Sequence, residues 1–329
     1  TTSYIEMNEW TLPAAQASTY HALVETEKAA GRFATHKPFL RGGIWRNFMS
    51  RYPEANWMHK RMLGLSQRLA ALPEHTGTPA QRAEMQAQLH RAQANDAYWH
   101  GLFGGLYLPH LRRAVWHNLL QLEAALERLA PQPPSPPSPP MDLDLDGHAE
   151  LVLRGKTLRA ILRSDGDAAL VELSSLALAH NFGDTLRRHA ELYHQKVGAD
   201  GTAPTAKNAA ESNGGIASAH DRVAFLHAIT PADAVPDARP RGIALDTLIT
   251  ADGRRQSLNA YRPLTADDAA DAVGFVAAGD GWRVEKRYTL RDDELEIAWR
   301  LDGAAARNCR LETEINLALP SCDGFGGRY

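Results

Sequence analysis

The sequence lacks several features that would place it in a common protein class. Only two cysteines, Cys309 and Cys322, occur in 329 residues, which excludes a disulfide-rich framework, leaves one bridge open and favours a reducing compartment, the cytoplasm. No apolar run reaches the ~18 residues that a membrane span needs, so we expect no membrane association. A net charge of −3 gives no strong field for nucleic acid. A neutral substrate fits best.

A proline-rich stretch at residues 131–140 separates two textures of sequence. It predicts a stiff, extended spacer. Helical spacing precedes it and two-residue alternation follows it. We therefore predict an α+β, multidomain chain, with an α-helical bundle over 1–130 and an antiparallel β-sandwich over 141–329. Thr1 is not an initiator Met and the last residues are glycine-rich, so we expect both ends to be cut from something longer.

Apolar residues before the spacer recur every three or four positions, which predicts the buried faces of helices. The three stripes are Met58, Met62, Leu65 and Leu69; Met85, Leu89 and Ala92; and Leu111, Val115, Leu119, Leu122, Leu126 and Leu129. Thr78 followed by Pro79 predicts the start of the second helix.

Beyond the spacer, alternation predicts strands. Apolar residues alternate over 282–290 and again over 295–301, across the polar turn 291–294, which predicts a hairpin. Residues 198–215, rich in Ala, Thr, Asn and Gly, predict a long mobile loop.

The most unusual segment is Gln93–Gly105 (QANDAYWHGLFGG). It combines an acid, an amide, an imidazole and aromatic rings with three glycines, a mixture that suits neither helix nor strand. Aromatic faces stack on sugar rings and carboxylates accept hydrogen bonds from hydroxyls, so the segment could bind carbohydrate. On composition alone, the favoured interpretation is that Tyr98 and Trp99 are core residues and Asp96 caps a helix.

The segment 93–105 resembles the fifth sequence region of glycoside hydrolase family 57, in its α-amylase and 4-α-glucanotransferase branch. Relatives typically have Cys where this chain has Ala94, and residues 176–182 also depart from the family pattern, which leaves fine specificity and some sandwich contacts open. The other resembling segments are Ser3–Pro13 (SYIEMNEWTLP), Lys37–Phe48 (KPFLRGGIWRNF), Tyr52–Met62 (YPEANWMHKRM), Tyr107–Trp116 (YLPHLRRAVW), Gly215–Val223 (GIASAHDRV) and Leu319–Gly324 (LPSCDG).

The resemblance implies a distorted (β/α) barrel that carries the chemistry, followed by a helical bundle and a β-sandwich. Residues 1–130 would then be the end of the catalytic region. It also implies a retaining mechanism on α-1,4-glucosidic bonds of an α-glucan or maltooligosaccharide, with a Glu nucleophile and an Asp acid/base about 5–5.5 Å apart. Both residues belong to motifs upstream of this chain, so we expect the isolated chain to be inactive. The resemblance also implies that the chemistry requires no cofactor.

Two residues match family positions that line the substrate site. The resemblance implies that Asp96 binds sugar hydroxyls or orients a catalytic neighbour, and that Trp99 stacks on a glucosyl ring. Glu9 and Trp10 are further candidates for a supporting role near the site, against a plain structural role. The spacing of Glu6 and Glu9 does not decide whether they face each other.

A second motif, DLDLDGHAE, follows the spacer at residues 142–150. Asp142, Asp144, Asp146 and Glu150 could supply carboxylate oxygens to calcium, with Gly147 making the turn. The twelfth position of an EF-hand would need Glu, and here it is Leu153. A structural calcium site and a strand with solvated aspartates both stay open.

Other classes of function stay open as rivals. The chain could be a non-catalytic carbohydrate-binding or assembly module, and a homodimer is an open expectation. Hydrolysis and transglycosylation are not distinguished. The histidine spacing fits no zinc pattern.

Overall fold

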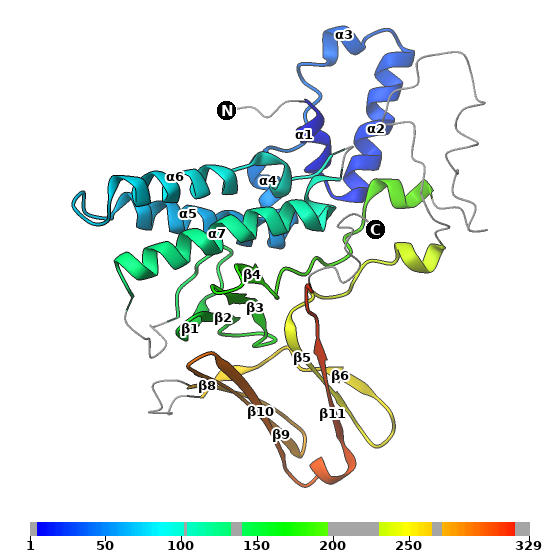
Figure 1. Cartoon of the computed structure of the whole chain (residues 1–329). Coiled ribbons are helices and arrows are strands. Elements are labelled where there is room, and N and C mark those ends of the chain that lie inside the picture. Colours follow the sequence, from blue (N-terminus) through cyan, green and yellow to red (C-terminus); the bar gives the residue numbers. More distant parts are fainter. Residues whose placement is uncertain (1–4, 102–103, 133–139, 197–229, 265–271, 320–329) are drawn as a thin grey trace. The chain divides into compact units, whose positions relative to one another are not determined.

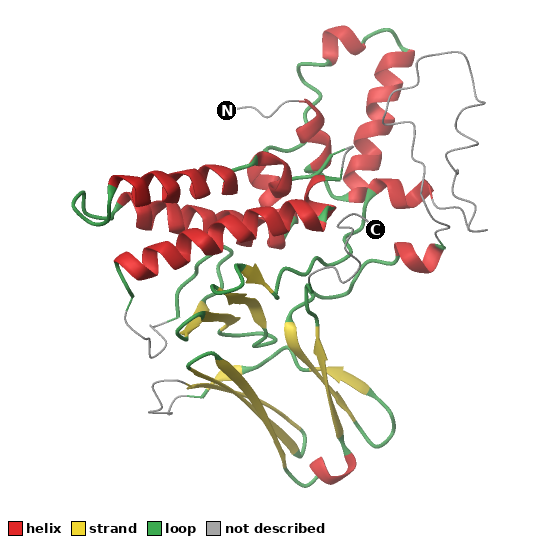
Figure 2. Cartoon of the chain, viewed as in Figure 1, coloured by secondary structure: helices red, strands yellow, loops and turns green. Residues whose placement is uncertain are grey.

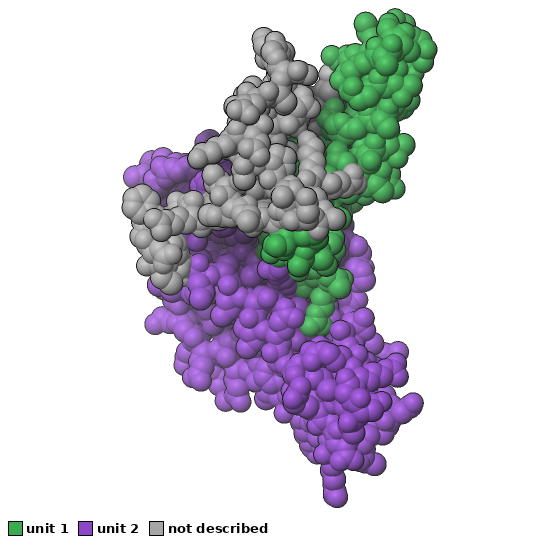
Figure 3. All heavy atoms as spheres, turned by 90° about the vertical axis from the view of Figure 1, so that its right-hand side faces the viewer, with its two compact units in different colours: residues 1–56, 98–107, 186–240 green, residues 57–97, 108–185, 241–329 purple. Residues whose placement is uncertain are grey.

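The computed structural model describes residues 5–101, 104–132, 140–196, 230–264 and 272–319. The chain divides into two compact units, each built from separate stretches of sequence (Figure 3). Unit 1 comprises residues 1–56, 98–107 and 186–240, and unit 2 comprises residues 57–97, 108–185 and 241–329. We describe each unit by itself.

Unit 1 is mainly helical (Figure 1). Its α-helices are α1 (Ile5–Trp10), α2 (Ala14–Ala29), α3 (Phe33–His36) and α4 (Trp45–Arg51), and its 3-10 helices are η2 (Gly105–Tyr107), η3 (Leu192–Lys196) and η5 (Pro231–Ala234). Helix α1 contacts both α2 and α4.

A glycine pair holds α1 close to the start of α4. The backbone nitrogen of Gly43 donates to the Asn8 carbonyl oxygen at 3.0 Å. A Cβ atom on Gly42 would lie 2.0 Å from the same oxygen, so a larger residue would force the two segments apart. A Cβ atom on Gly43 would lie 2.3 Å from the Thr11 hydroxyl oxygen, so the close approach favours glycine at both positions.

Unit 2 contains three longer helices: α5 (Pro53–Ala70, in this unit from Trp57), α6 (Pro79–Ala92) and α7 (Pro109–Leu129). The Thr78 hydroxyl accepts from the Gln81 backbone nitrogen and Pro79 is the first helical residue, as predicted. The predicted apolar stripes are buried, with Leu111 and Leu129 at the ends of α7 only partly covered. The apolar spacing in the sequence therefore predicted the buried faces of these helices correctly.

Two antiparallel sheets complete unit 2 (Figure 2). The larger sheet follows the order β1-β2-β3-β5-β11, with β4 beside β3 and β6 beside β5, and the smaller follows β10-β9-β8-β7. The larger sheet contains β1 (Glu150–Arg154), β2 (Leu158–Arg163), β3 (Leu170–Ser175), β4 (His180–Asn181), β5 (Ile243–Ile249), β6 (Arg255–Ser257) and β11 (Arg310–Ile315). The smaller contains β7 (Arg262–Pro263), β8 (Ala272–Gly279), β9 (Trp282–Arg291) and β10 (Glu294–Asp302), and the 3-10 helix η6 (Ala306–Asn308) follows it.

The two sheets share one apolar core. Leu162 and Leu248 from the larger sheet pack in one cluster with Phe275, Val284 and Tyr288 from the smaller. This is the packing of a sandwich.

A buried ion pair also joins the two sheets. The Lys286 Nζ atom on β9 lies 2.9 Å from Asp246 Oδ2 on β5, and both side chains are fully buried. Asp246 accepts three further hydrogen bonds, from the Tyr261 hydroxyl (2.8 Å), the Trp299 indole (3.0 Å) and the Thr313 hydroxyl (2.7 Å). Every polar atom of this carboxylate is thus satisfied, as burial of a charge requires.

The other face of the larger sheet packs against the helices through ion pairs. On α5, the Arg61 guanidinium donates to Glu172 on β3 at 2.8 Å and to Glu123 on α7 at 2.6 Å. On β2, Arg159 donates to Glu123 at 3.3 Å. Strands β2 and β3 are therefore covered on both faces, which explains why charged residues within them are buried.

The α+β class is confirmed, as are the helical bundle and the antiparallel sandwich. The predicted hairpin is also confirmed, because β9 pairs with β10 across Arg291 and Glu294. Residues 133–139 of the predicted spacer and the predicted loop at 198–215 lie outside the described residues, and the domain boundaries stay predictions. Among the described helices, none has the length and hydrophobicity that crossing a membrane requires.

Candidate functional site

The segment 98–107 of unit 1 carries Trp99. It begins at the last residue of the short η1 (Asn95–Tyr98) and ends with η2, and residues 102–103 lie outside the described residues. Gly104 and Gly105 both have positive φ, which glycine adopts without strain. The Trp99 carbonyl oxygen accepts from the Leu106 backbone nitrogen at 2.9 Å, which brings these two residues together.

The four predicted substrate residues lie in different parts of the structure. Trp99 is partly exposed in unit 1, and Asp96 is exposed at the end of its segment in unit 2. Glu9 and Trp10 end helix α1 and are both partly exposed, and Glu9 lies 3.9 Å from the His21 imidazole. The Trp10 ring contacts His100, the neighbour of Trp99, edge to face at 5.1 Å between centroids. Within unit 1, Trp10 and the Trp99 segment therefore meet through His100.

A buried carboxylate lies beneath this contact. The Glu191 side chain is only 1% exposed. It accepts hydrogen bonds from the Tyr52 hydroxyl at 2.6 Å, the Tyr107 hydroxyl at 2.5 Å and the Arg51 guanidinium at 2.7 Å. Two of these donors come from the end of α4 and one from η2. We call these four residues with His100 the Glu191 cluster.

His100 extends the cluster towards Trp10. Its Nε2 atom lies 2.5 Å from the Tyr52 hydroxyl and 3.6 Å from Glu191 Oε1. Burial lowers the pKa of His100 to about 4, and Glu191 opposes this shift only partly. Burial, reinforced by the Glu191 charge, raises the pKa values of Tyr52 and Tyr107 well above their ordinary range. At neutral pH the imidazole is therefore neutral and both phenols remain hydrogen-bond donors.

Arg51 connects the cluster to the end of α1. Its Nη1 atom donates to the Trp10 carbonyl oxygen at 2.9 Å and to that of Leu12. The same guanidinium lies over the Tyr52 ring, 4.8 Å from its centroid. A guanidinium has several donors in a fixed plane, so it can bind a carboxylate and two carbonyls at once.

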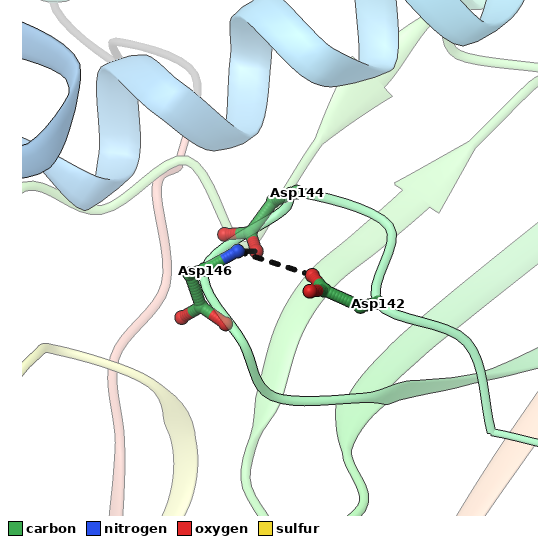
Figure 4. Close-up of side chains that lie close together, drawn as sticks. All are labelled: Asp142, Asp144 and Asp146. Carbon is green, nitrogen blue, oxygen red and sulfur yellow. Dashed lines mark hydrogen bonds between the residues drawn. The ribbon is translucent and has the colours of Figure 1, made fainter. Parts of the chain in front are cut away.

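The predicted calcium residues lie in unit 2, where Asp142, Asp144 and Asp146 form a compact loop (Figure 4). Each offers a carboxylate oxygen within 4.8 Å of the others. Asp142 accepts from the backbone nitrogens of Asp146 (3.1 Å) and Gly147 (3.0 Å). Residues 142–148 form no strand, so the alternating-strand interpretation is wrong.

Glu150 does not belong to this group of three. Its Oε2 atom accepts from the Leu143 backbone nitrogen at 2.8 Å, and its Oε1 atom lies 3.7 Å from Arg163 Nε. Burial raises the pKa of Glu150 to about 7 and that of Asp144 to about 6, and neighbouring aspartates add to both shifts. A divalent cation would suit the close negative charges of the three aspartates.

Sequence patterns did not point to Glu191. It lies in no segment that resembles the family and follows no periodic spacing, and its partners are 84 to 140 positions away in sequence. His100 and Tyr107 do lie in the resembling segments. The only sequence signal for this cluster is that a polar residue, His100, lies beside the aromatic residues of the resembling segment.

Comparison with known proteins agrees with this combination of helical bundle, antiparallel sandwich and aromatic loop. Residues 43–126 match the family model for the middle domain of alpha-amylase/4-alpha-glucanotransferase, and residues 142–329 match the model for its C-terminal domain. The chain belongs to this alpha-amylase/4-alpha-glucanotransferase family, of the glycoside hydrolase family 57 type.

Two curated relatives illustrate the match. A 4-alpha-glucanotransferase of Thermococcus litoralis is 34% identical over 99% of this chain and 44% of its own length. An alpha-amylase of Pyrococcus furiosus is 37% identical over 97% of this chain and 46% of its own length. The crystal structure of 4-alpha-glucanotransferase from Thermococcus litoralis superposes with a TM-score of 0.67 at 31% identity, covering 92% of this chain and 43% of that one. The chain thus spans less than half the length of these relatives.

Proposed function

We propose that this chain is the C-terminal part of an enzyme that cleaves, and can re-form, α-1,4-glucosidic bonds in α-glucans or maltooligosaccharides. The observation that carries the proposal is the alignment of 97–99% of the chain with relatives named alpha-amylase and 4-alpha-glucanotransferase. The matches to the middle and C-terminal family models give its place in the enzyme. The catalytic Glu and Asp that the resemblance implies belong to the part that precedes it.

In this proposal the chain contributes substrate contacts. The partly exposed Trp99 presents an indole face to a glucosyl ring, and the exposed Asp96 carboxylate accepts hydrogen bonds from sugar hydroxyls. Glu9 and Trp10 support the site from the end of α1. The low cysteine content also leads us to infer a cytoplasmic location, and a homodimer stays a prediction.

Activity measurements on two polypeptides test the proposal. The purified 329-residue chain should neither hydrolyse nor disproportionate maltooligosaccharides. In the full-length enzyme, Trp99→Ala and Asp96→Asn should each lower kcat/KM at least tenfold, about 1.4 kcal/mol of transition-state binding, while leaving the protein folded.

Trp116→Ala is the matched control, because Trp116 on α7 is 3% exposed. Truncating a buried tryptophan typically costs about 3–5 kcal/mol of stability, so this variant should lose activity by unfolding. A Trp99→Ala enzyme that melts as early as Trp116→Ala, together with a fully active Asp96→Asn enzyme, would show that the aromatic segment is core. Turnover by the purified chain would show that the active site is misplaced.

We further propose that the aspartate loop binds calcium as a structural ion. Asp142, Asp144 and Asp146 bring their oxygens close together in a turn that the resemblance to short Asp-x-Asp-x-Asp-Gly loops predicts. A bound divalent cation would offset the repulsion among these carboxylates. Glu150 is a further oxygen donor in the proposed site, and reaching the ion would require it to exchange its bond to Leu143.

A further inference from the structure

The Glu191 cluster is a buried polar network with an unusual distribution along the chain. A single carboxylate binds side chains from α4 and from the 98–107 segment, although Tyr52 and Tyr107 are 139 and 84 positions away from it. Taking a carboxylate out of water is costly unless several donors surround it, and here two hydroxyls and a guanidinium do so. A fully satisfied network of this kind makes the buried region rigid and specifies one geometry.

Two members of the cluster lie next to the backbone contact of Trp99. The Leu106 backbone nitrogen donates to the Trp99 carbonyl oxygen at 2.9 Å. His100 directly follows Trp99 and Tyr107 directly follows Leu106. The His100 Nε2 atom lies 3.6 Å from Glu191 Oε1, and the Tyr107 hydroxyl donates to the same oxygen at 2.5 Å. The side-chain contacts of these two neighbours therefore set where the Trp99 backbone lies.

The same cluster fixes the end of α1. Arg51 binds Glu191 with Nη2 and the Trp10 carbonyl with Nη1. The Trp10 ring also packs against His100. Glu191 is thus connected, through one intermediate residue on each side, to both aromatic residues that we predict to bind glucan.

We propose that Glu191 is a positioning residue for the glucan site, fixing the Trp99 segment through Tyr107 and His100. This inference rests on the proposed function, because it assigns Glu191 a role in presenting Trp99 to the sugar. Glu191 itself is buried and does not touch substrate.

Tyr107→Phe tests the inference in the full-length enzyme, because it removes one hydroxyl and keeps the ring. The matched control is Tyr261→Phe in the sandwich, where a hydroxyl likewise donates to a buried carboxylate, at 2.8 Å from Asp246. We expect Tyr107→Phe to lower kcat/KM for maltooligosaccharides about tenfold. Tyr261→Phe should lower the melting temperature by a similar amount without changing kcat/KM for the folded enzyme.

A double variant distinguishes positioning from a general structural effect. If Tyr107 acts through Trp99, then Trp99→Ala combined with Tyr107→Phe should have the same kcat/KM as Trp99→Ala alone. Glu191→Gln, which keeps the shape and removes the charge, should behave as Tyr107→Phe does. Independent effects that multiply, or equal kcat/KM in Tyr107→Phe and Tyr261→Phe, would overturn the inference. Lack of turnover by the wild-type enzyme would instead refute the proposed function.

Discussion

Replacing Lys286 by methionine should destabilise the sandwich severely. The substitution keeps an apolar stem of similar length but leaves the Asp246 charge, fully buried, without its cation 2.9 Å away. It also removes the donor that the Ala244 and Asp167 carbonyls share. Breaking a buried ion pair on one side typically costs about 3–5 kcal/mol. Three hydrogen bonds to Asp246 remain, so we expect the lower end, about 3 kcal/mol.

Urea unfolding followed by circular dichroism measures this change. The matched control is Arg255→Met, which breaks the exposed pair between Arg255 on β6 and Glu312 on β11, where the arginine side chain is 60% exposed. An exposed pair contributes about 0–1 kcal/mol, so the control should unfold almost as the wild type does.

A second substitution checks the cause. Adding Asp246→Asn to Lys286→Met removes the uncompensated charge while its amide oxygen can still accept hydrogen bonds, so the double variant should be more stable than Lys286→Met alone. The explanation is wrong if Lys286→Met loses no more stability than Arg255→Met. It is also wrong if the double variant loses as much stability as Lys286→Met and Asp246→Asn lose together as single variants.

Three further outcomes follow from the described contacts. Arg61→Met should cost about 3–5 kcal/mol of stability in denaturant unfolding, because it removes a cation from two buried glutamates. The control Arg91→Met breaks a pair that is more than half exposed and should cost no more than about 1 kcal/mol. Equal costs for the two variants would contradict this prediction. Calcium should raise the melting temperature relative to chelator, because the ion adds about 2.7 kcal/mol of stability at a hundred times Kd. Asp144→Asn should remove this shift, and identical melting curves with and without calcium would exclude the site. The pKa of His100 is lowered to about 4, so the unfolded chain, at about 6.5, binds the extra proton. The neutral, buried imidazole therefore contributes up to about 3 kcal/mol to the free energy of unfolding. This contribution is fully present above pH ~6.5 and is lost as pH falls through 4. His100→Gln should reduce the difference in the free energy of unfolding between pH 7.5 and pH 4.5.

The sequence predicted the regular elements well, because their cause is local. Met58, Leu65 and Leu119 mark helical faces by spacing alone, and Thr78 with Pro79 marks a helix start by hydrogen-bonding capacity. The β9–β10 hairpin follows from alternation on both sides of a polar turn.

Contacts between distant segments could not be predicted in the same way. Nothing local distinguishes Glu172 or Glu191 from a surface glutamate, yet both are buried because arginines from far along the chain reach them. The two-sided burial of β2 depends on helices that alternation cannot reveal. The resemblance identified the Trp99 segment, but the carboxylate beneath it became visible only once the chain was folded.

Unit 1 is assembled from residues 1–56, 98–107 and 186–240, which has a consequence for the order of events during synthesis. Arg51, Tyr52 and Tyr107 are synthesised long before Glu191. These donors therefore cannot bind their common acceptor until most of unit 2's helices and its first strands have been synthesised. Such distant pairings cost loop-closure entropy before they give any stability, and they form slowly. The loop that carries Trp99 would therefore be among the last parts of the nascent chain to take its final position.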